Sequence, residues 1–161
     1  MKDRISEEQA FQRLAALCAR GEHCSYDMQE KMRQWGLDED AQAKVIERLE
    51  RERYIDNARY AAAFVRDKVR YNQWGRRKVE QALWMKHIDA GIARQALDEI
   101  SDDEYVSILK PMLKQKRRST NAKSEYELNI KLMKWAMGRG FTMDIIRQCM
   151  TVDEDVDEYL D

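Results

Sequence analysis

Residues 32–46, with the sequence MRQWGLDEDAQAKVI, contain the pattern that decides the fold of this chain. Apolar residues four apart before Gly36 mark one face of a helix, and glycine ends that helix because it tolerates a left-handed backbone. Leu37 then fills the turn, and Asp38 is an N-cap residue for a next helix with the same apolar spacing. The segment therefore predicts two helices joined by a short turn. The positions of this first copy are Met28, Met32, Gly36, Leu37, Asp38, Ala41, Val45 and Ile46.

The same pattern occurs twice more, 51 and then 53 residues further along the chain. In the second copy His87 replaces the glycine, and histidine is among the residues enriched at positive φ. A repeat of this length built from helices is typical of an extended stack, and it favours a binding scaffold over an enzyme. The further copies are Val79, Leu83, His87, Ile88, Asp89, Ile92, Ala96 and Leu97, and then Leu132, Ala136, Gly140, Phe141, Thr142, Ile145, Cys149 and Met150.

The composition favours an all-α protein. Of the 161 residues only 6 are glycine and 1 is proline, whereas 37% are charged and 43% are hydrophobic. So few turn-forming residues exclude a turn-rich β protein, and the hydrophobic share is sufficient for a continuous core. The formal net charge of −1 does not indicate a globally basic nucleic-acid-binding protein.

The sequence predicts a cytoplasmic protein without a membrane partner. No segment approaches the roughly 20 apolar residues that a membrane helix needs. Residues 1–8 lack the apolar core of a signal peptide. The three cysteines have no CxxC spacing, so a disulfide framework is not expected.

Capping and turn residues predict nine helices in three groups of three. We expect repeats at residues 1–53, 54–100 and 101–150, followed by an acidic tail at 151–161. Ser25 is the expected N-cap of the second helix. The seventh helix is expected to break near Lys110, because Pro111 removes a backbone donor and crowds the preceding turn. The tail has six acids and no base. It is interpreted as a solubilising end, with a tenth helix or an intramolecular competitor for the basic faces as alternatives.

No motif indicates catalysis or metal binding. The two histidines, His23 and His87, and the three cysteines do not have the spacing of a zinc site. The chain contains no Gly-rich phosphate loop, no GxSxG and no HExxH. We therefore expect neither an enzyme nor a cofactor, a metal or a small-molecule substrate.

Two segments are strongly basic. Residues 66–86 contain seven bases against two acids, and residues 110–123 contain six bases and no acid. Arg59, Arg66 and Arg70 fall within about 40° of one another on a helix. The run at 76–78 lies at a helix start, where cations oppose the helix dipole, and this suggests an external anion such as phosphate or an acidic protein surface. The alternative is that both segments are ordinary solvated faces of charged helices.

Residues 53–65, RYIDNARYAAAFV, resemble the hallmark of the RecX regulatory family. Residues 72–83, NQWGRRKVEQAL, are similar to the Gly-rich break and basic helix that follow that hallmark. The turns at 35–38 and 139–142 resemble the family's repeat signature, and the resemblance extends over residues 10–150. The chain departs from the family pattern at Arg53 and His87, where glycine is common, at Asn57, which replaces an aspartate, and at Arg76-Arg77, which replaces Gly-Pro.

The resemblance implies three tandem three-helix repeats in an elongated, curved array. It also implies binding to the RecA recombinase and its filament on DNA, along the filament groove. The implied effect is to inhibit the ATPase, strand-exchange and coprotease activities of RecA, and so to regulate DNA repair without catalysis. A monomer is expected, although Trp74 and Trp84, interpreted as exposed, leave room for self-association.

Contact with filament acids or DNA phosphates is assigned to basic residues of the second and third repeats. In the hallmark, Tyr54, Ile55, Tyr60 and Phe64 are assigned to the core. Two alternatives stay open: a helix-turn-helix DNA-binding regulator, and a protein-interaction scaffold whose basic faces are only solvated. The assigned contact residues are Arg59, Arg66, Arg70, Arg76, Arg77, Lys78, Lys114, Lys116, Arg117 and Arg118.

Overall fold

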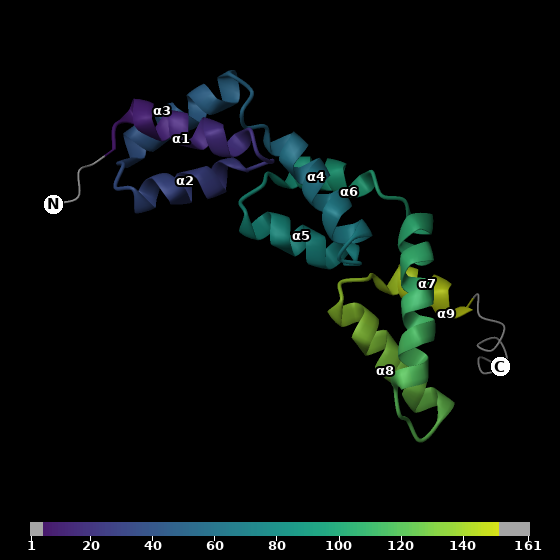
Figure 1. Cartoon of the computed structure of the whole chain (residues 1–161). Coiled ribbons are helices and arrows are strands. Elements are labelled where there is room, and N and C mark those ends of the chain that lie inside the picture. The colour runs from purple at the N-terminus through teal and green to yellow at the C-terminus, as the bar shows by residue number, and fades with distance from the viewer. Residues whose placement is uncertain (1–4, 152–161) are drawn as a thin grey trace. The chain divides into compact units, whose positions relative to one another are not determined.

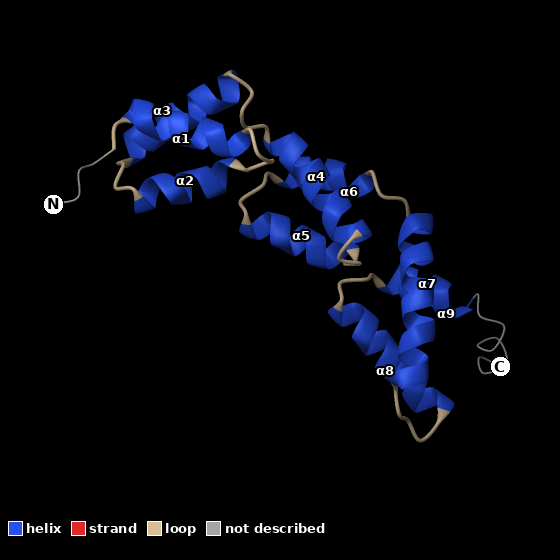
Figure 2. Cartoon of the chain, viewed as in Figure 1, coloured by secondary structure: helices blue, strands red, loops and turns tan. Residues whose placement is uncertain are grey.

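A computed structural model describes residues 5–151 of the chain. Within this range the protein consists of nine helices and no strand, which confirms the prediction of an all-α fold (Figures 1 and 2). Residues 152–161 of the acidic tail, for which a tenth helix was one alternative, lie outside the described residues. The helices are α1 (Glu7–Cys18), α2 (Ser25–Gln34), α3 (Glu39–Arg51), α4 (Asn57–Arg70), α5 (Arg76–Met85), α6 (Ala90–Asp98), α7 (Asp102–Ser119), α8 (Glu125–Gly138) and α9 (Met143–Thr151).

The turn that follows the second helix of each repeat has the predicted geometry in all three copies. Gly36, His87 and Gly140 have φ values of 84°, 56° and 95°. The side chain of Asp38 accepts a hydrogen bond from Ala41 N at 2.8 Å, and Asp89 accepts one from Ile92 N at 3.2 Å. The repeated pattern of the sequence therefore corresponds to a repeated local structure, including the histidine that replaces glycine.

Ser25 is not the N-cap of α2, as the sequence suggested, but its first helical residue. The cap comes from Asn57, the first residue of α4. Asn57 Oδ1 accepts a hydrogen bond from Ser25 N at 3.0 Å, and Asn57 Nδ2 donates one to Ser25 Oγ at 3.0 Å. The side chain that satisfies the start of α2 thus lies 32 residues further along the chain, so local capping rules could not identify it.

We expect Asn57→Ala to lower the free energy of unfolding by about 1–2 kcal/mol, because it removes a helix cap and a partly buried hydrogen bond. Asn57→Asp should retain most of this stability at neutral pH, since a carboxylate still accepts from Ser25 N and the Ser25 hydroxyl can donate to it. Urea denaturation of the two variants measures the difference. Equal losses in both variants would contradict the assigned cap.

α7 continues through Pro111, and the predicted break near Lys110 is wrong. Proline at this position removes the bond to the carbonyl of Ser107, four residues earlier. Ser107 and Pro111 are both exposed, so water can solvate the released carbonyl group. The helix is therefore uninterrupted over Asp102–Ser119, and its basic residues lie on one rigid element.

Contacts divide the chain into two compact units. Unit 1 comprises residues 1–64 and 83–93, and unit 2 comprises residues 65–82 and 94–161, so the division runs through α4, α5 and α6. The predicted division into three repeats at residues 53 and 100 stays a prediction.

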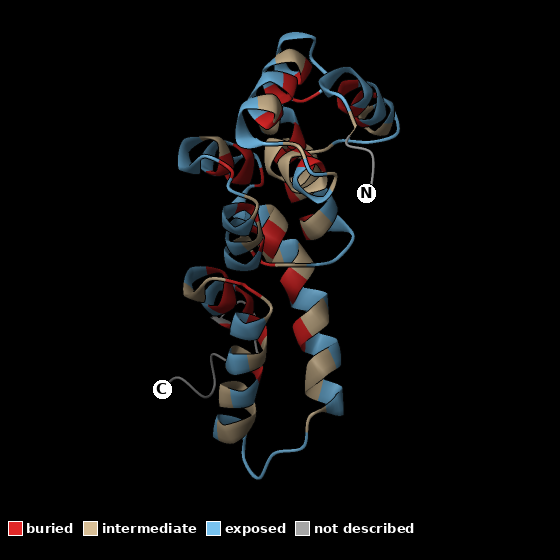
Figure 3. Cartoon of the chain, turned by 90° about the vertical axis from the view of Figure 1, so that its left-hand side faces the viewer, coloured by how far each residue is buried: buried red, intermediate tan, exposed pale blue. Residues whose placement is uncertain are grey.

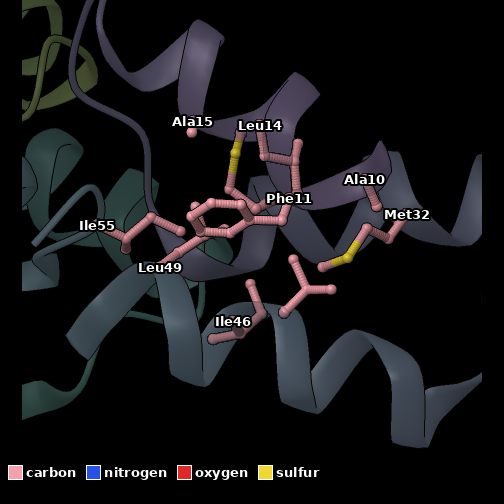
Figure 4. Close-up of a cluster of buried hydrophobic side chains, with 10 residues drawn as sticks. Ala10, Phe11, Leu14, Ala15, Met32, Ile46, Leu49 and Ile55 are labelled. Atoms are coloured by element: carbon pink, nitrogen blue, oxygen red, sulfur yellow. The ribbon is translucent and has the colours of Figure 1, made fainter. Parts of the chain in front are cut away.

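The core of unit 1 lies between α1, α2 and α3 (Figure 4). Ile55 and Tyr60 of the hallmark are buried as predicted, and Phe64 is half-buried. Tyr54, however, is 39% exposed and lies with its ring edge-on to Phe11, at a centroid distance of 5.8 Å. The assignment of Tyr54 to the core is therefore wrong. The buried cluster contains Ala10, Phe11, Leu14, Ala15, Met28, Met32, Val45, Ile46, Leu49 and Ile55.

In unit 2, α7, α8 and α9 pack against one another. Figure 3 shows that buried residues recur along these helices between exposed ones, as expected for amphipathic helices. Their largest fully buried side chains are Tyr105, Leu109, Leu132, Phe141 and Ile146.

Candidate basic interface

Five of the ten assigned basic residues are engaged in ion pairs within their own unit. Each of these arginines lies on α4, α5 or α7, and its carboxylate partner lies on another part of the chain. The arginine stripe of α4 is therefore largely neutralised and fastens α4 to neighbouring segments. The pairs are Arg59–Glu22 at 2.6 Å, Arg66–Glu99 at 3.2 Å, Arg70–Glu104 at 2.8 Å, Arg76–Asp98 at 2.7 Å and Arg117–Glu125 at 3.1 Å.

The pairing of Arg70 with Glu104 illustrates the effect on charge. The hydrogen bond from Arg70 to Glu104 raises the pKa of the guanidinium above its ordinary value, and the Coulombic attraction to Glu104 adds to it. Both side chains are about one-third to one-half exposed, so the pair is solvated and adds little to stability. These arginines position helices, and they present little free positive charge.

The N-terminus of α5 is capped from within unit 2. Gly75 N donates to the carbonyl of Arg139 at 2.9 Å, and Arg77 N donates to the carbonyl of Gly140 at 2.9 Å. The end of α8 therefore supplies partial negative charge where the helix dipole of α5 is positive. With Asp98 beside Arg76, the compensation that the sequence suggested for an external anion comes from the chain itself.

Two tryptophans of unit 2 each lie close to two cations. Lys68 Nζ and Lys78 Nζ lie 5.0 and 4.5 Å from the centre of the Trp74 ring. Lys116 Nζ and Arg139 Cζ lie 5.5 and 5.3 Å from the Trp135 ring. Such cation–π contacts hold Lys78 and Lys116 against the protein surface.

The tryptophans that the sequence suggested as exposed differ in burial. Trp74 is half-buried in this arrangement, whereas Trp84 is 76% exposed. Of these two tryptophans, only Trp84 is therefore accessible enough for self-association.

Arg77, Lys114 and Arg118 are the assigned residues that are exposed and have neither an ion-pair partner nor a cation–π contact among residues 5–151, whereas the exposed Lys78 lies over Trp74. Lys110, one of the six bases of residues 110–123 but not one of the assigned residues, has the same properties. Lys110, Lys114 and Arg118 are four residues apart on the continuous α7, so each step rises about 6 Å along the helix. We call these three residues the α7 basic stripe.

The described residues offer no metal centre and no membrane-spanning helix. No group of three or more His, Cys, Asp or Glu side chains in this part of the chain is placed to hold a metal ion. None of the helices within residues 5–151 combines the length and apolar composition required to cross a membrane. The three cysteines are free thiols, and burial raises the pKa of the Cys149 thiol to about 11.

Two family models match this chain, and both describe parts of one family. The model of the second three-helix domain of RecX matches residues 56–97, and that of the third matches residues 102–150. Together these matches cover more than half of the 161 residues.

Similar proteins carry the same family name. A "Regulatory protein RecX" of Vibrio parahaemolyticus is 28% identical over 151 residues, which are 93% of this chain and 92% of that protein. One of Acinetobacter baylyi is 27% identical over 135 residues, 84% of this chain and 82% of the relative. The chain spans about half the length of other relatives, including that of Oceanobacillus iheyensis, 26% identical over 75% of this chain and 46% of the relative.

Solved structures share the fold. The crystal structure of RecX from Lactobacillus salivarius superimposes with a TM-score of 0.82 at 21% identity, over 94% of this chain and 97% of that one. A second structure, of a regulatory protein RecX, gives a TM-score of 0.83 at 18% identity, over 89% of this chain and 72% of that one. With the two domain matches and the relatives of similar length, the repeated helical architecture has a clear assignment: the chain belongs to the RecX family of regulatory proteins.

Proposed function

We propose that this protein binds the RecA recombinase and its filament on DNA, and that it inhibits the ATPase, strand-exchange and coprotease activities of RecA. It acts as a cytoplasmic monomer and regulates DNA repair without catalysing a reaction. Family membership supports the regulatory role, and the link to RecA comes from the sequence resemblance described above. The observation that carries the choice of surface is the α7 basic stripe, whose cations have no carboxylate partner among the described residues.

We propose that the ten assigned residues have different roles. Arg77, Lys114 and Arg118, joined by Lys110, contact acids of the filament or DNA phosphates. Lys78 and Lys116 lie over tryptophans and contribute less, because part of their charge already interacts with a ring. The arginines in ion pairs keep the helices in place, namely Arg59, Arg66, Arg70, Arg76 and Arg117.

The test is DNA-dependent ATP hydrolysis by the cognate RecA, with this protein titrated in. We expect the native chain to inhibit hydrolysis, and Lys114→Glu/Arg118→Glu to need at least about tenfold more protein for half-inhibition, since reversing two charges replaces attraction by repulsion. The loss should shrink at high salt, where exposed charges are screened.

Arg20→Glu/Lys44→Glu is the matched control. Both residues are exposed and lack an ion-pair partner among the described residues, and the pair gives the same change in net charge. Equal weakening by both double variants would contradict the choice of the α7 basic stripe. Absence of inhibition by folded native protein would contradict RecA regulation and favour a DNA-binding regulator or an interaction scaffold.

A further inference from the structure

The end of α9 lies beside the part of α7 that carries Lys110, the first cation of the α7 basic stripe. α7 and α9 pack against each other, and the thiol of Cys149 lies 3.7 Å from the carbonyl oxygen of Val106. Lys110, one helical turn further along α7, is close enough to Cys149 to oppose the rise in the thiol pKa that burial causes. α9 ends at Thr151, two residues after Cys149. The chain therefore leaves α9 near Lys110.

The sequence that follows α9 has the opposite charge. Residues 152–161 contain no base and six carboxylates, namely Asp153, Glu154, Asp155, Asp157, Glu158 and Asp161. The α7 basic stripe, in contrast with the five paired arginines, has no carboxylate partner among residues 5–151. The cations without a carboxylate partner among residues 5–151 and the acids of residues 152–161 therefore belong to one chain.

The connection is long enough to bring them together. Ten extended residues span up to about 35 Å. The distance along α7 from Lys110 to Arg118 is about 12 Å at 1.5 Å per residue. The segment can therefore reach every cation of the stripe without full extension.

We propose that residues 152–161 bind the α7 basic stripe of the same chain and compete there with the anionic groups of an external partner. Each exposed carboxylate–cation contact is weak, because water and salt screen the two charges. The covalent tether, however, gives the segment an effective concentration in the range of about 1 mM or more. Several weak contacts at that concentration suffice to occupy the stripe at low salt, while a strong polyanionic partner can still displace the segment.

Intramolecular docking can be tested on the full chain without any partner. A carbodiimide activates a carboxylate, and a lysine amine within contact distance then forms an amide while the activated group leaves as a urea. We expect mass spectrometry to find amide links from the acids of residues 152–161 to Lys110 and Lys114, within one molecule. Mixing isotopically light and heavy protein distinguishes these links from intermolecular ones.

The links should be lost in 1 M salt, where the Debye length is about 3 Å. Lys44, an exposed lysine on α3, serves as a reference for unselective reaction. Links that are equally frequent at Lys44, or absent at both stripe lysines, would overturn the docking.

The competition, which rests on the proposed function, is tested with a short fluorescein-labelled single-stranded oligonucleotide. A full-length variant with five of the six tail acids neutralised as amides should bind it about threefold to tenfold more tightly than the native chain at low salt. The variant carries Asp153→Asn, Glu154→Gln, Asp155→Asn, Asp157→Asn and Glu158→Gln.

Adding Lys110→Gln/Lys114→Gln/Arg118→Gln to both forms should abolish that gain. A gain of equal size with the stripe neutralised would show a general effect of net charge and contradict competition at this site. If the oligonucleotide binds neither form, the proposed DNA contact and the competition are contradicted, and the cross-links still decide whether the segment docks.

Discussion

Gly75→Ala is expected to lower the free energy of unfolding by at least about 3 kcal/mol, the combined cost of overpacking and of two backbone hydrogen bonds. A Cβ atom on Gly75 would overlap the backbone of Gly140 and Phe141, which cannot move aside as a flexible side chain does. The N-terminus of α5 would have to separate from the turn after α8. The bonds from Gly75 N and Arg77 N to the carbonyls of Arg139 and Gly140 would then be lost.

Chemical denaturation of Gly75→Ala measures this loss, and Gly138→Ala is the matched control. Gly138 is the last residue of α8, and a Cβ atom there would meet no other atom within 4 Å. Alanine is the better helix former, so Gly138→Ala should be neutral or stabilising by up to about 1 kcal/mol. Similar stability of the two variants would contradict the close backbone approach at Gly75.

Phe141→Ala is expected to cost about 3–5 kcal/mol, the usual cost of removing a buried phenylalanine side chain. Phe141 fills the turn of the third repeat and is only 2% exposed. Leu37 holds the equivalent position in the first repeat but is half-buried. Leu37→Ala should therefore cost clearly less, about 1–2 kcal/mol for the apolar surface that it buries.

Urea denaturation compares Phe141→Ala with Leu37→Ala. The midpoints give the two losses of stability when both variants have the same dependence of the unfolding free energy on urea concentration. A smaller loss for Phe141→Ala than for Leu37→Ala would show that the third turn contributes less to the folded core than its burial indicates. If the dependence of the unfolding free energy on urea concentration changes in only one variant, the two losses are measured by thermal unfolding instead. Equal losses in Phe141→Ala and Leu37→Ala would also contradict the prediction.

The local rules of the sequence predicted most of the helical framework. Apolar spacing, N-cap residues and the three turn positions depend on neighbours within one or two helical turns, and these contacts exist in any fold that contains the helices. His87 is an informative case, because its place in the repeat predicted positive φ against the usual preference for glycine. The family resemblance rested on the same local segments, in particular residues 53–65.

The errors came from contacts between segments that are distant in sequence. Asn57 caps α2 across 32 residues, and Tyr54 lies on the surface although its neighbours in the hallmark are buried. Pro111 remains in a continuous helix because the carbonyl that it leaves free lies on an exposed part of α7. In each case the outcome depends on what lies beside a residue in space.

The candidate interface also depends partly on the sequence alone and partly on the tertiary structure. Counting charges identified the two basic segments, because the number of cations is a property of the sequence alone. Which cations remain free was decided by the tertiary structure, since Arg66, Arg70 and Arg76 are matched by carboxylates 22 to 34 residues away. The exposed stripe on α7 exists because the helix continues through Pro111 and because its other cations, Lys116 and Arg117, lie against Trp135 and Glu125. Helix positions follow from local spacing, whereas free charge depends on the packing of distant segments.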